Sequence, residues 1–152
     1  MNPIVVLDAG PLNLTCYDPG RPVPDRCLKW LADLDSAGII IILPSIADFE
    51  VRRELIRLGA SSRLRNLDAL RYRLAYLDIS REALDKAAAF WADLRNKGLP
   101  TAGPDSLDAD AILAGMAATI GRPGDSVIVA TTNVRHLTRF PGMDARFWEA
   151  IG

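Results

Sequence analysis

Acidic, amide and hydroxyl side chains recur in this sequence where apolar segments begin or end. The residues concerned are Asp8, Glu50, Asp108, Asp110, Thr131 and Asn133. Carboxylates held close together repel one another, which raises their pKa values unless a cation neutralises them. A set of oxygen donors without Cys or His favours Mg²⁺ or Mn²⁺ over softer ions. The residue types therefore predict a carboxylate-bound divalent cation, the usual apparatus for phosphoryl transfer to an activated water.

Each of these acids taken alone also has a purely structural explanation. A turn aspartate that bonds its own backbone accounts for Asp8, and the helix dipole favours an acid such as Glu50 in the first turns of a helix. Helix capping explains one of Asp108 and Asp110 well and the second less well. A site therefore exists only if the fold brings the acids together.

The apolar segments predict an α/β fold. Residues 4–7 and 39–43 are continuous apolar runs, which are typical of strands covered on both faces, and residues 126–131 are predicted to form a third buried strand. Residues 76–79 form a further short candidate strand, and the tail around Phe147 and Trp148 is a candidate edge strand. Helical patterns lie between these strands, which favours a mostly parallel sheet between two layers of helices. Ligands of such sheets bind at the carboxyl ends of the strands, where the polar residues above are found.

The helices are predicted from apolar spacing and from their end signals. They cover residues 25–37, 45–59, 62–74 and 80–98, and a last apolar helix runs through Ile120. Ser45 is the expected cap of the second helix, and Ser106 or Asp108 of the last. Residues 8–11 are expected to form a turn, and residues 98–105 a loop.

Composition narrows the class of protein. The chain has 152 residues, 49% of them apolar, and a net charge of −1, which predicts one domain over 1–152 and no general nucleic-acid coat. Cys16 and Cys27 have neither disulfide-framework nor metal-finger spacing and mildly favour a reducing compartment. The longest apolar stretch, 39–43, is far below the roughly 20 residues that span a bilayer, and no signal peptide is evident. We therefore expect a cytoplasmic protein without a membrane segment.

Four motifs in order carry a family resemblance over almost the whole chain. Residues 6–9, 43–50, 107–114 and 129–137 resemble the corresponding motifs of the PIN-domain family, and within it the single-domain VapC-type toxins of toxin–antitoxin pairs. The resemblance implies a PIN-like three-layer α/β/α fold with a central mostly parallel sheet. It also implies a Mg²⁺- or Mn²⁺-dependent endoribonuclease, an RNA substrate, an antitoxin protein as partner, and a homodimer.

The resemblance also assigns residues. Asp8, Glu50 and Asp110 match the three acids of the motif, and Asn133 stands where the family has Asp or Asn, beside Thr131. The implied catalytic set is Asp8, Glu50, Asp110 and Asn133, and the metal ligands are Asp8, Glu50 and Asp110. Asp108 is an auxiliary metal ligand that ranks below Asp110. A neutral Asn133 is a weak metal ligand, which leaves the number of metal ions, one or two, open.

Arginines concentrate in the stretch that follows Glu50. They are Arg52, Arg53, Arg57, Arg63, Arg65, Arg71 and Arg73, and the acids that oppose them there are taken to be Glu54 and Asp68 alone. Arginine can hold two phosphate oxygens at once, so this local basic zone is a candidate RNA contact. Arg53, one turn from Glu50, and Thr131 are the expected substrate-binding residues. A solvated, salt-bridged helical face explains the same arginines equally well.

Two other functions compete with a nuclease. A phospho-aspartyl domain would use Asp8 as a nucleophile, but Gly10 stands where a phosphatase of that class needs a second Asp, and no lysine follows a late strand. A degenerate PIN-like module that binds RNA or protein without cleavage stays open. The single histidine, His136, is expected to be structural or exposed rather than catalytic.

Overall fold

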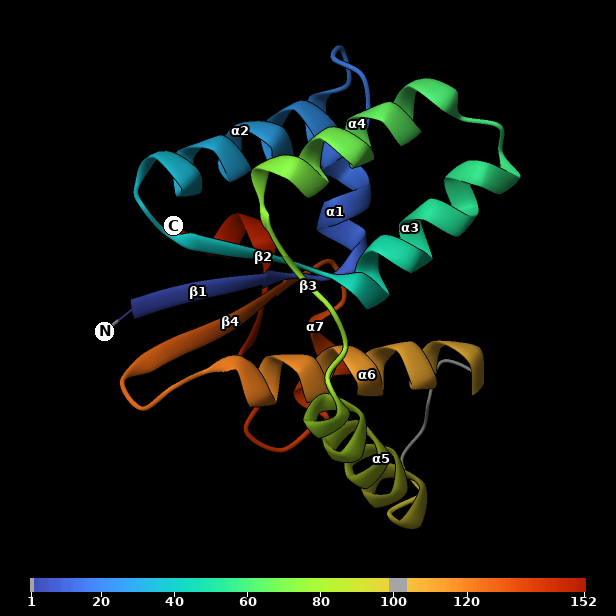
Figure 1. Ribbon diagram of the computed structural model, residues 1–152, viewed down its shortest axis with the longest axis vertical. Helices are drawn as coiled ribbons and strands as arrows, with labels where there is room; N and C mark the ends of the chain where they lie inside the picture. Colours follow the sequence, from blue (N-terminus) through green and yellow to red (C-terminus); the bar gives the residue numbers. More distant parts are fainter. Residues whose placement is uncertain (1, 99–103) are drawn as a thin grey trace.

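The computed structural model describes residues 2–98 and 104–152 and centres on a five-stranded sheet (Figure 1). The strand order is β3-β2-β1-β4-β5 and every neighbouring pair is parallel. In the central register, Val6 lies between Ile42 on one side and Val129 on the other. The strands are β1 (Asn2–Leu7), β2 (Ile40–Pro44), β3 (Ala75–Leu77), β4 (Asp125–Thr131) and β5 (Ala145–Phe147). The mostly parallel sheet predicted from the apolar runs is confirmed.

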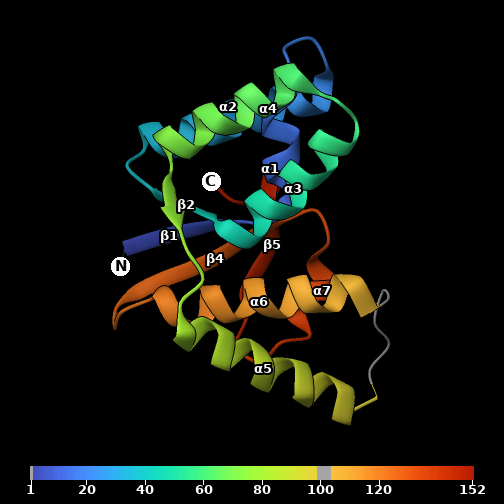
Figure 2. The same cartoon turned by 45° about the vertical axis from the view of Figure 1, so that its right-hand side comes forward.

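Helices cover both faces of the sheet, as the two views in Figures 1 and 2 show. Helices α1 to α4 lie on one side, and α5, α6 and the short α7 on the other. The bounds are α1 (Ala9–Thr15), α2 (Pro22–Ser36), α3 (Ser45–Arg57), α4 (Ser61–Arg73), α5 (Arg81–Asn96), α6 (Pro104–Ile120) and α7 (Val134–Thr138), and a 3₁₀ turn follows β5 at Trp148–Ala150. The predicted three-layer α/β/α arrangement is therefore present.

Two hydrophobic cores form because successive side chains of a strand point to opposite faces. Val5 and Leu7 of β1 belong to the core under α1 to α4, whereas Ile4 and Val6 belong to the core under α5 and α6. This explains why residues 4–7 of β1 are all apolar instead of alternating. No helix in the described part of the chain is long and apolar enough to cross a membrane.

Several local predictions are wrong at the ends of elements. Residues 8–11 do not form a simple turn, because α1 starts directly after Asp8, and α7 follows β4 where no helix was expected. Ser45 is the first residue of α3, and its buried hydroxyl has no hydrogen-bond partner, so it does not cap that helix. Helix α6 starts at Pro104, which places Ser106 and Asp108 inside it rather than at its cap. Of the predicted loop 98–105, residues 99–103 lie outside the described residues.

Candidate metal-dependent active site

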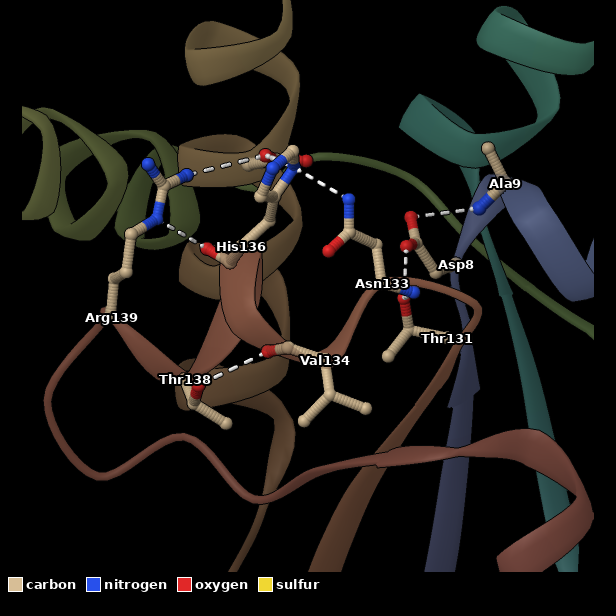
Figure 3. A network of polar contacts seen from close by, with 9 residues as sticks. Asp8, Ala9, Thr131, Asn133, Val134, His136, Thr138 and Arg139 are labelled. Carbon is tan, nitrogen blue, oxygen red and sulfur yellow. Dashed lines mark hydrogen bonds and ion pairs between the residues drawn. The ribbon is translucent and has the colours of Figure 1, made fainter. Parts of the chain in front are cut away.

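Asp8 is the best-anchored acid of the site. It follows β1 and caps α1, where its Oδ1 accepts a hydrogen bond from Ala9 N at 2.8 Å. Its Oδ2 accepts a second hydrogen bond, from Thr131 Oγ1 at 2.7 Å (Figure 3). Burial raises the pKa of Asp8, and the bonds from Thr131 and Ala9 offset only part of that rise. Asp8 thus makes the turn-type backbone bond and a second bond to Thr131, while its role in a site stays a prediction.

Glu50, on α3, is the second acid of the candidate site. Within the described residues its carboxylate accepts no hydrogen bond and forms no ion pair. Burial first, and then the nearby charges of Asp8 and Asp110, raise the pKa of Glu50 to about 7, against a smaller opposite effect of Arg53. Mutual repulsion of this kind requires short distances between the carboxylates. The predicted acids of β1, α3 and α6 are therefore brought together.

Asp110 completes the acidic cluster from α6. Its pKa is raised to about 6, first by burial and then by the charge of Asp8, while Arg139 lowers it. Its Oδ2 lies 3.5 Å from Arg139 Nη2 and 3.6 Å from His136 Nδ1, yet this buried oxygen accepts no hydrogen bond. Asp110 thus keeps an acceptor atom that the described side chains leave unsatisfied.

The segment after β4 supports Asp8 through Thr131. Thr131 is fully buried, and its Oγ1 both donates to Asp8 and accepts a hydrogen bond from Asn133 N at 2.9 Å. A Cβ on Gly10 would collide with the Thr132 side chain, so the glycine lets α1 approach this segment closely. Thr131 thus positions Asp8, and its contact with substrate stays a prediction for a side chain that is fully buried in this structure.

Asn133 and His136 lie further along the same segment. Asn133 is exposed, and its Nδ2 contacts His136 Nδ1 at 3.0 Å (Figure 3). His136 in turn faces Asp110, so the expectation that this histidine is structural or exposed needs refinement: it borders the acidic cluster. Sequence reasoning missed both His136 and Arg139 as site residues. Their spacing of three would have grouped them on one helical face had α7 been predicted.

Solved structures similar in fold come from toxin–antitoxin complexes. A chain of DNA-bound VapBC2 from Rickettsia felis matches with a TM-score of 0.72 and 18% identity, covering 95% of this chain and 98% of that one. A chain of DNA-bound VapBC from Salmonella typhimurium matches with a TM-score of 0.63 and 27% identity, covering 95% and 97%. VapBC-1 from nontypeable Haemophilus influenzae gives 0.66 and 15%, covering 96% and 98%. No protein-family model and no curated protein sequence matches the chain.

The chain has a PIN-like fold. Its likeness to chains of VapBC complexes over 95% or more of its length agrees with the resemblance to VapC-type PIN proteins found in the motifs. In this PIN-like frame, Asp8, Glu50 and Asp110 stand at the carboxyl edge of the sheet, where open parallel sheets bind ligands.

Asp108 does not join the PIN-like acidic cluster. Residues two positions apart on a helix point in nearly opposite directions, since each residue turns the helix by about 100°. Asp108 instead lines an apolar depression between α5 and α6, together with Leu84, Trp91 and Ile112. Its predicted role as an auxiliary metal ligand therefore has no geometric support.

The basic zone is partly neutralised: three of its seven arginines pair with acids, and Asp48 opposes them in addition to the predicted Glu54 and Asp68. Asp48, only 2% exposed, accepts hydrogen bonds from Arg52 Nε at 2.8 Å and Arg71 Nε at 3.1 Å. Arg52 also pairs with Asp68, and Arg57 pairs with Glu54. Sequence reasoning missed Asp48, although its spacing of four from Arg52 is the usual signal of a helical ion pair.

Two other arginines of the basic zone differ in their contacts. Arg63 contacts residues outside the zone, and Arg53 lies beside the acidic cluster. Arg63 stacks over the Tyr17 ring at 3.7 Å and donates to Asn13 Oδ1 at 2.6 Å. Arg53 is exposed beside Glu50 and lies over the Phe49 ring at 5.3 Å. With Ala9 and Glu50, it lines a depression of about 370 Å³ next to Asp8. Arg53 is thus the arginine of this zone that the fold brings to the acidic cluster.

The donor set fits a hard divalent cation in type. Among residues 2–98 and 104–152, no group of three or more Asp, Glu, His or Cys side chains is arranged so that it could hold a metal ion. Mg²⁺, however, is usually held by only one or two carboxylates, with waters and substrate filling its remaining positions. Asp8 and Asp110 supply two such carboxylates, and the charge of Asp8 acts on Asp110. Asp110 Oδ2, which accepts no hydrogen bond, is an oxygen that a Mg²⁺ ion could bind.

Proposed function

We propose that this chain is a Mg²⁺- or Mn²⁺-dependent endoribonuclease of the VapC type, restrained by an antitoxin protein. The observation that carries the proposal is the convergence of three carboxylates whose pKa values are all raised, first by burial; the charge of Asp8 raises those of Glu50 and Asp110 further. A folded protein keeps such mutual repulsion at a functional site, where a cation or a proton transfer makes use of it. The toxin–antitoxin complexes of similar fold support the same class.

The side chains of the site have distinct roles in this proposal. Asp8, held by Thr131, and Asp110 would hold the cation, which when bound acidifies water and neutralises the charge that develops on the phosphate. Glu50, whose pKa of about 7 lies near the working pH, accepts a proton from the attacking water. Arg53 binds a phosphate next to the scissile one, and Asn133 orients groups at the rim.

The proposed function also predicts which proteins bind this chain. The structures of similar fold are complexes of VapBC type, so we propose an antitoxin that covers the acidic edge, and a homodimer of the nuclease. A partner that covers this edge would place a basic group against Glu50, because this acid forms no ion pair within the described residues. Removal of the partner would then be the step that allows RNA to reach Asp8 and Glu50.

The test is cleavage of a mixed pool of tRNA and structured rRNA fragments in Mn²⁺, in Mg²⁺ and in EDTA. Asp8→Asn, prepared in parallel, exposes contaminating ribonuclease, and we expect it to lose at least about a hundredfold in rate because a ligand charge is removed. Arg146→Gln, at an exposed ion pair with Asp144, is the matched control and should cleave normally. Metal-dependent fragments that persist unchanged in the folded Asp8→Asn protein would contradict the proposal.

A PIN-like module without cleavage is the second candidate. The absence of a preformed three-ligand group within the described residues favours it. Such a module would not bind Mn²⁺, whereas the proposed nuclease binds it through Asp8 and Asp110. Calorimetric titration with Mn²⁺ in the absence of RNA separates the two functions.

A further inference from the structure

One segment of the chain contacts two acids of the site, Asp8 and Asp110, in different ways. Residues 131–139 run from the end of β4 through α7 (Figure 3). At its start, Thr131 holds Asp8 through a neutral hydrogen bond that leaves the full negative charge of the carboxylate available. At its end, Arg139 faces Asp110 with a positive charge at 3.5 Å and without a hydrogen bond.

The position of Arg139 is fixed from two sides. Its Nε donates a hydrogen bond to His136 O at 2.9 Å, which ties the guanidinium to the last turn of α7. Its carbon Cζ lies over the Phe140 ring at 5.8 Å. The side chains of Arg139 and Asp110 are only 15% and 16% exposed, so water screens their interaction weakly. Arg139 therefore acts as a fixed charge and not as a mobile surface cation.

The contact differs in geometry from the other buried ion pair of this chain, that of Asp48 with Arg52 and Arg71. Arginine usually binds a carboxylate through short, aligned and often paired hydrogen bonds, as Arg52 and Arg71 do with Asp48. The Arg139 contact is longer and leaves Asp110 Oδ2 without a hydrogen bond. The guanidinium compensates the charge of Asp110 but does not occupy its oxygen.

We propose that Arg139 is a built-in counter-ion of Asp110 that weakens cation binding, so that α7 sets the metal affinity of the site. The inference rests on the metal binding of the proposed function. A divalent cation on Asp110 is repelled by the guanidinium beside the same oxygen, because like charges at such separations interact strongly where water is scarce. In the metal-free protein, the same charge limits the repulsion among Asp8, Glu50 and Asp110.

The decisive experiment is Mn²⁺ binding without RNA, measured by electron paramagnetic resonance of free Mn²⁺ and by calorimetry. Arg139→Gln removes the charge, Arg139→Lys keeps it, and Arg146→Gln is the control for loss of an arginine outside the site. We expect Arg139→Gln to bind Mn²⁺ about 10- to 100-fold more tightly than the wild type. Arg139→Lys and Arg146→Gln should each stay within about threefold of the wild type, which a purely structural role of Arg139 would not produce.

The outcomes separate this inference from the nuclease proposal. Equal or weaker Mn²⁺ binding by folded Arg139→Gln, with binding by the wild type intact, overturns the inference alone. If neither the wild type nor any variant binds Mn²⁺, the metal site itself is wrong and both proposals fail. Tight binding by Arg139→Gln together with undetectable binding by the wild type supports the counter-ion and explains a protein that needs high metal concentrations.

A second measurement keeps the inference testable if Arg139→Gln does not fold. The Arg139 Nε–Hε resonance of the ¹⁵N-labelled wild type is assigned by its loss in Arg139→Lys, and Mg²⁺ is then added. The backbone amide of Ala9, which donates a hydrogen bond to Asp8, reports saturation of the site with Mg²⁺. We expect the Arg139 resonance to shift over the same range of Mg²⁺ concentration, and the Arg146 resonance to stay unchanged. An Arg139 resonance that does not move at saturation would overturn the inference.

Discussion

Helix α3 carries two acids, Asp48 and Glu50, in opposite electrostatic situations. Asp48 is almost fully buried, yet Arg52 and Arg71 supply hydrogen bonds to both of its oxygens. Glu50 is less buried, faces Asp8 and Asp110, and its pKa is raised to about 7. Because two positions on a helix differ by about 200° of rotation, each acid belongs to a different face. A satisfied acid holds elements together, and an unsatisfied one is available for chemistry.

The distinction matters for finding the site. By burial alone, Asp48 is the more unusual residue, since acids are almost never fully buried without a partner. Its partners, however, come from α3 and α4, and they complete its coordination. Glu50 has no such partner in the described part of the chain. On this helix, the absence of an ion pair, and not burial, is therefore what separates Glu50, a candidate functional carboxylate, from the structural Asp48.

The largest effect on stability should come from Asp48→Ala. It leaves Arg52 and Arg71 without their shared carboxylate and loosens α4 from α3, which we expect to cost about 2–4 kcal/mol in the free energy of unfolding. The value is below that of a fully buried pair because both arginines are partly exposed and Arg52 keeps Asp68. Urea denaturation measures it. A change as small as that of a surface substitution would show that Asp48 is not a structural acid.

Glu50→Gln should have the opposite sign and depend on pH. Folding raises the pKa of Glu50 from 4.5 to about 7, so the folded protein holds this proton more tightly and loses stability as pH rises from about 4.5 to about 7. The Gln variant should therefore equal the wild type near pH 4 and exceed its stability by about 1–2 kcal/mol at pH 8, a value reduced for partial exposure. Urea denaturation in EDTA across this range measures the difference. A variant less stable than the wild type at pH 8 would mean that Glu50 has a stabilising partner.

The smallest effect should come from Arg57→Gln. Arg57 pairs with Glu54 on the exposed face of α3, where solvent and salt screen the interaction. We expect no measurable change in the urea midpoint and none in Mn²⁺ binding. A midpoint shift comparable to that of Asp48→Ala would remove the contrast between buried and exposed pairs on this helix.

Much of the frame could be predicted from the sequence because apolar runs report burial directly. The strands β1, β2 and β4 and the helices α2 to α5 lie close to their predicted places, and Ser80 caps α5 as expected. Short elements escaped prediction: α1 and α7 have too few residues to show an apolar period. Cap assignments failed at Ser45 and Ser106 because several residues near each helix start were equally suited to the role.

The sequence by itself determined the three acids, the placement of Asp8 after a strand and of Glu50 in the first turns of a helix, and the PIN-like order of the motifs. Those features are local, since each depends on a residue type beside an apolar run. Only the tertiary structure decided which charges are compensated: that Asp48 takes Arg52 and Arg71, that Asp108 faces α5, and that Arg139 faces Asp110. Compensation depends on side chains that approach from other elements, and their distances are set by packing and not by position along the chain.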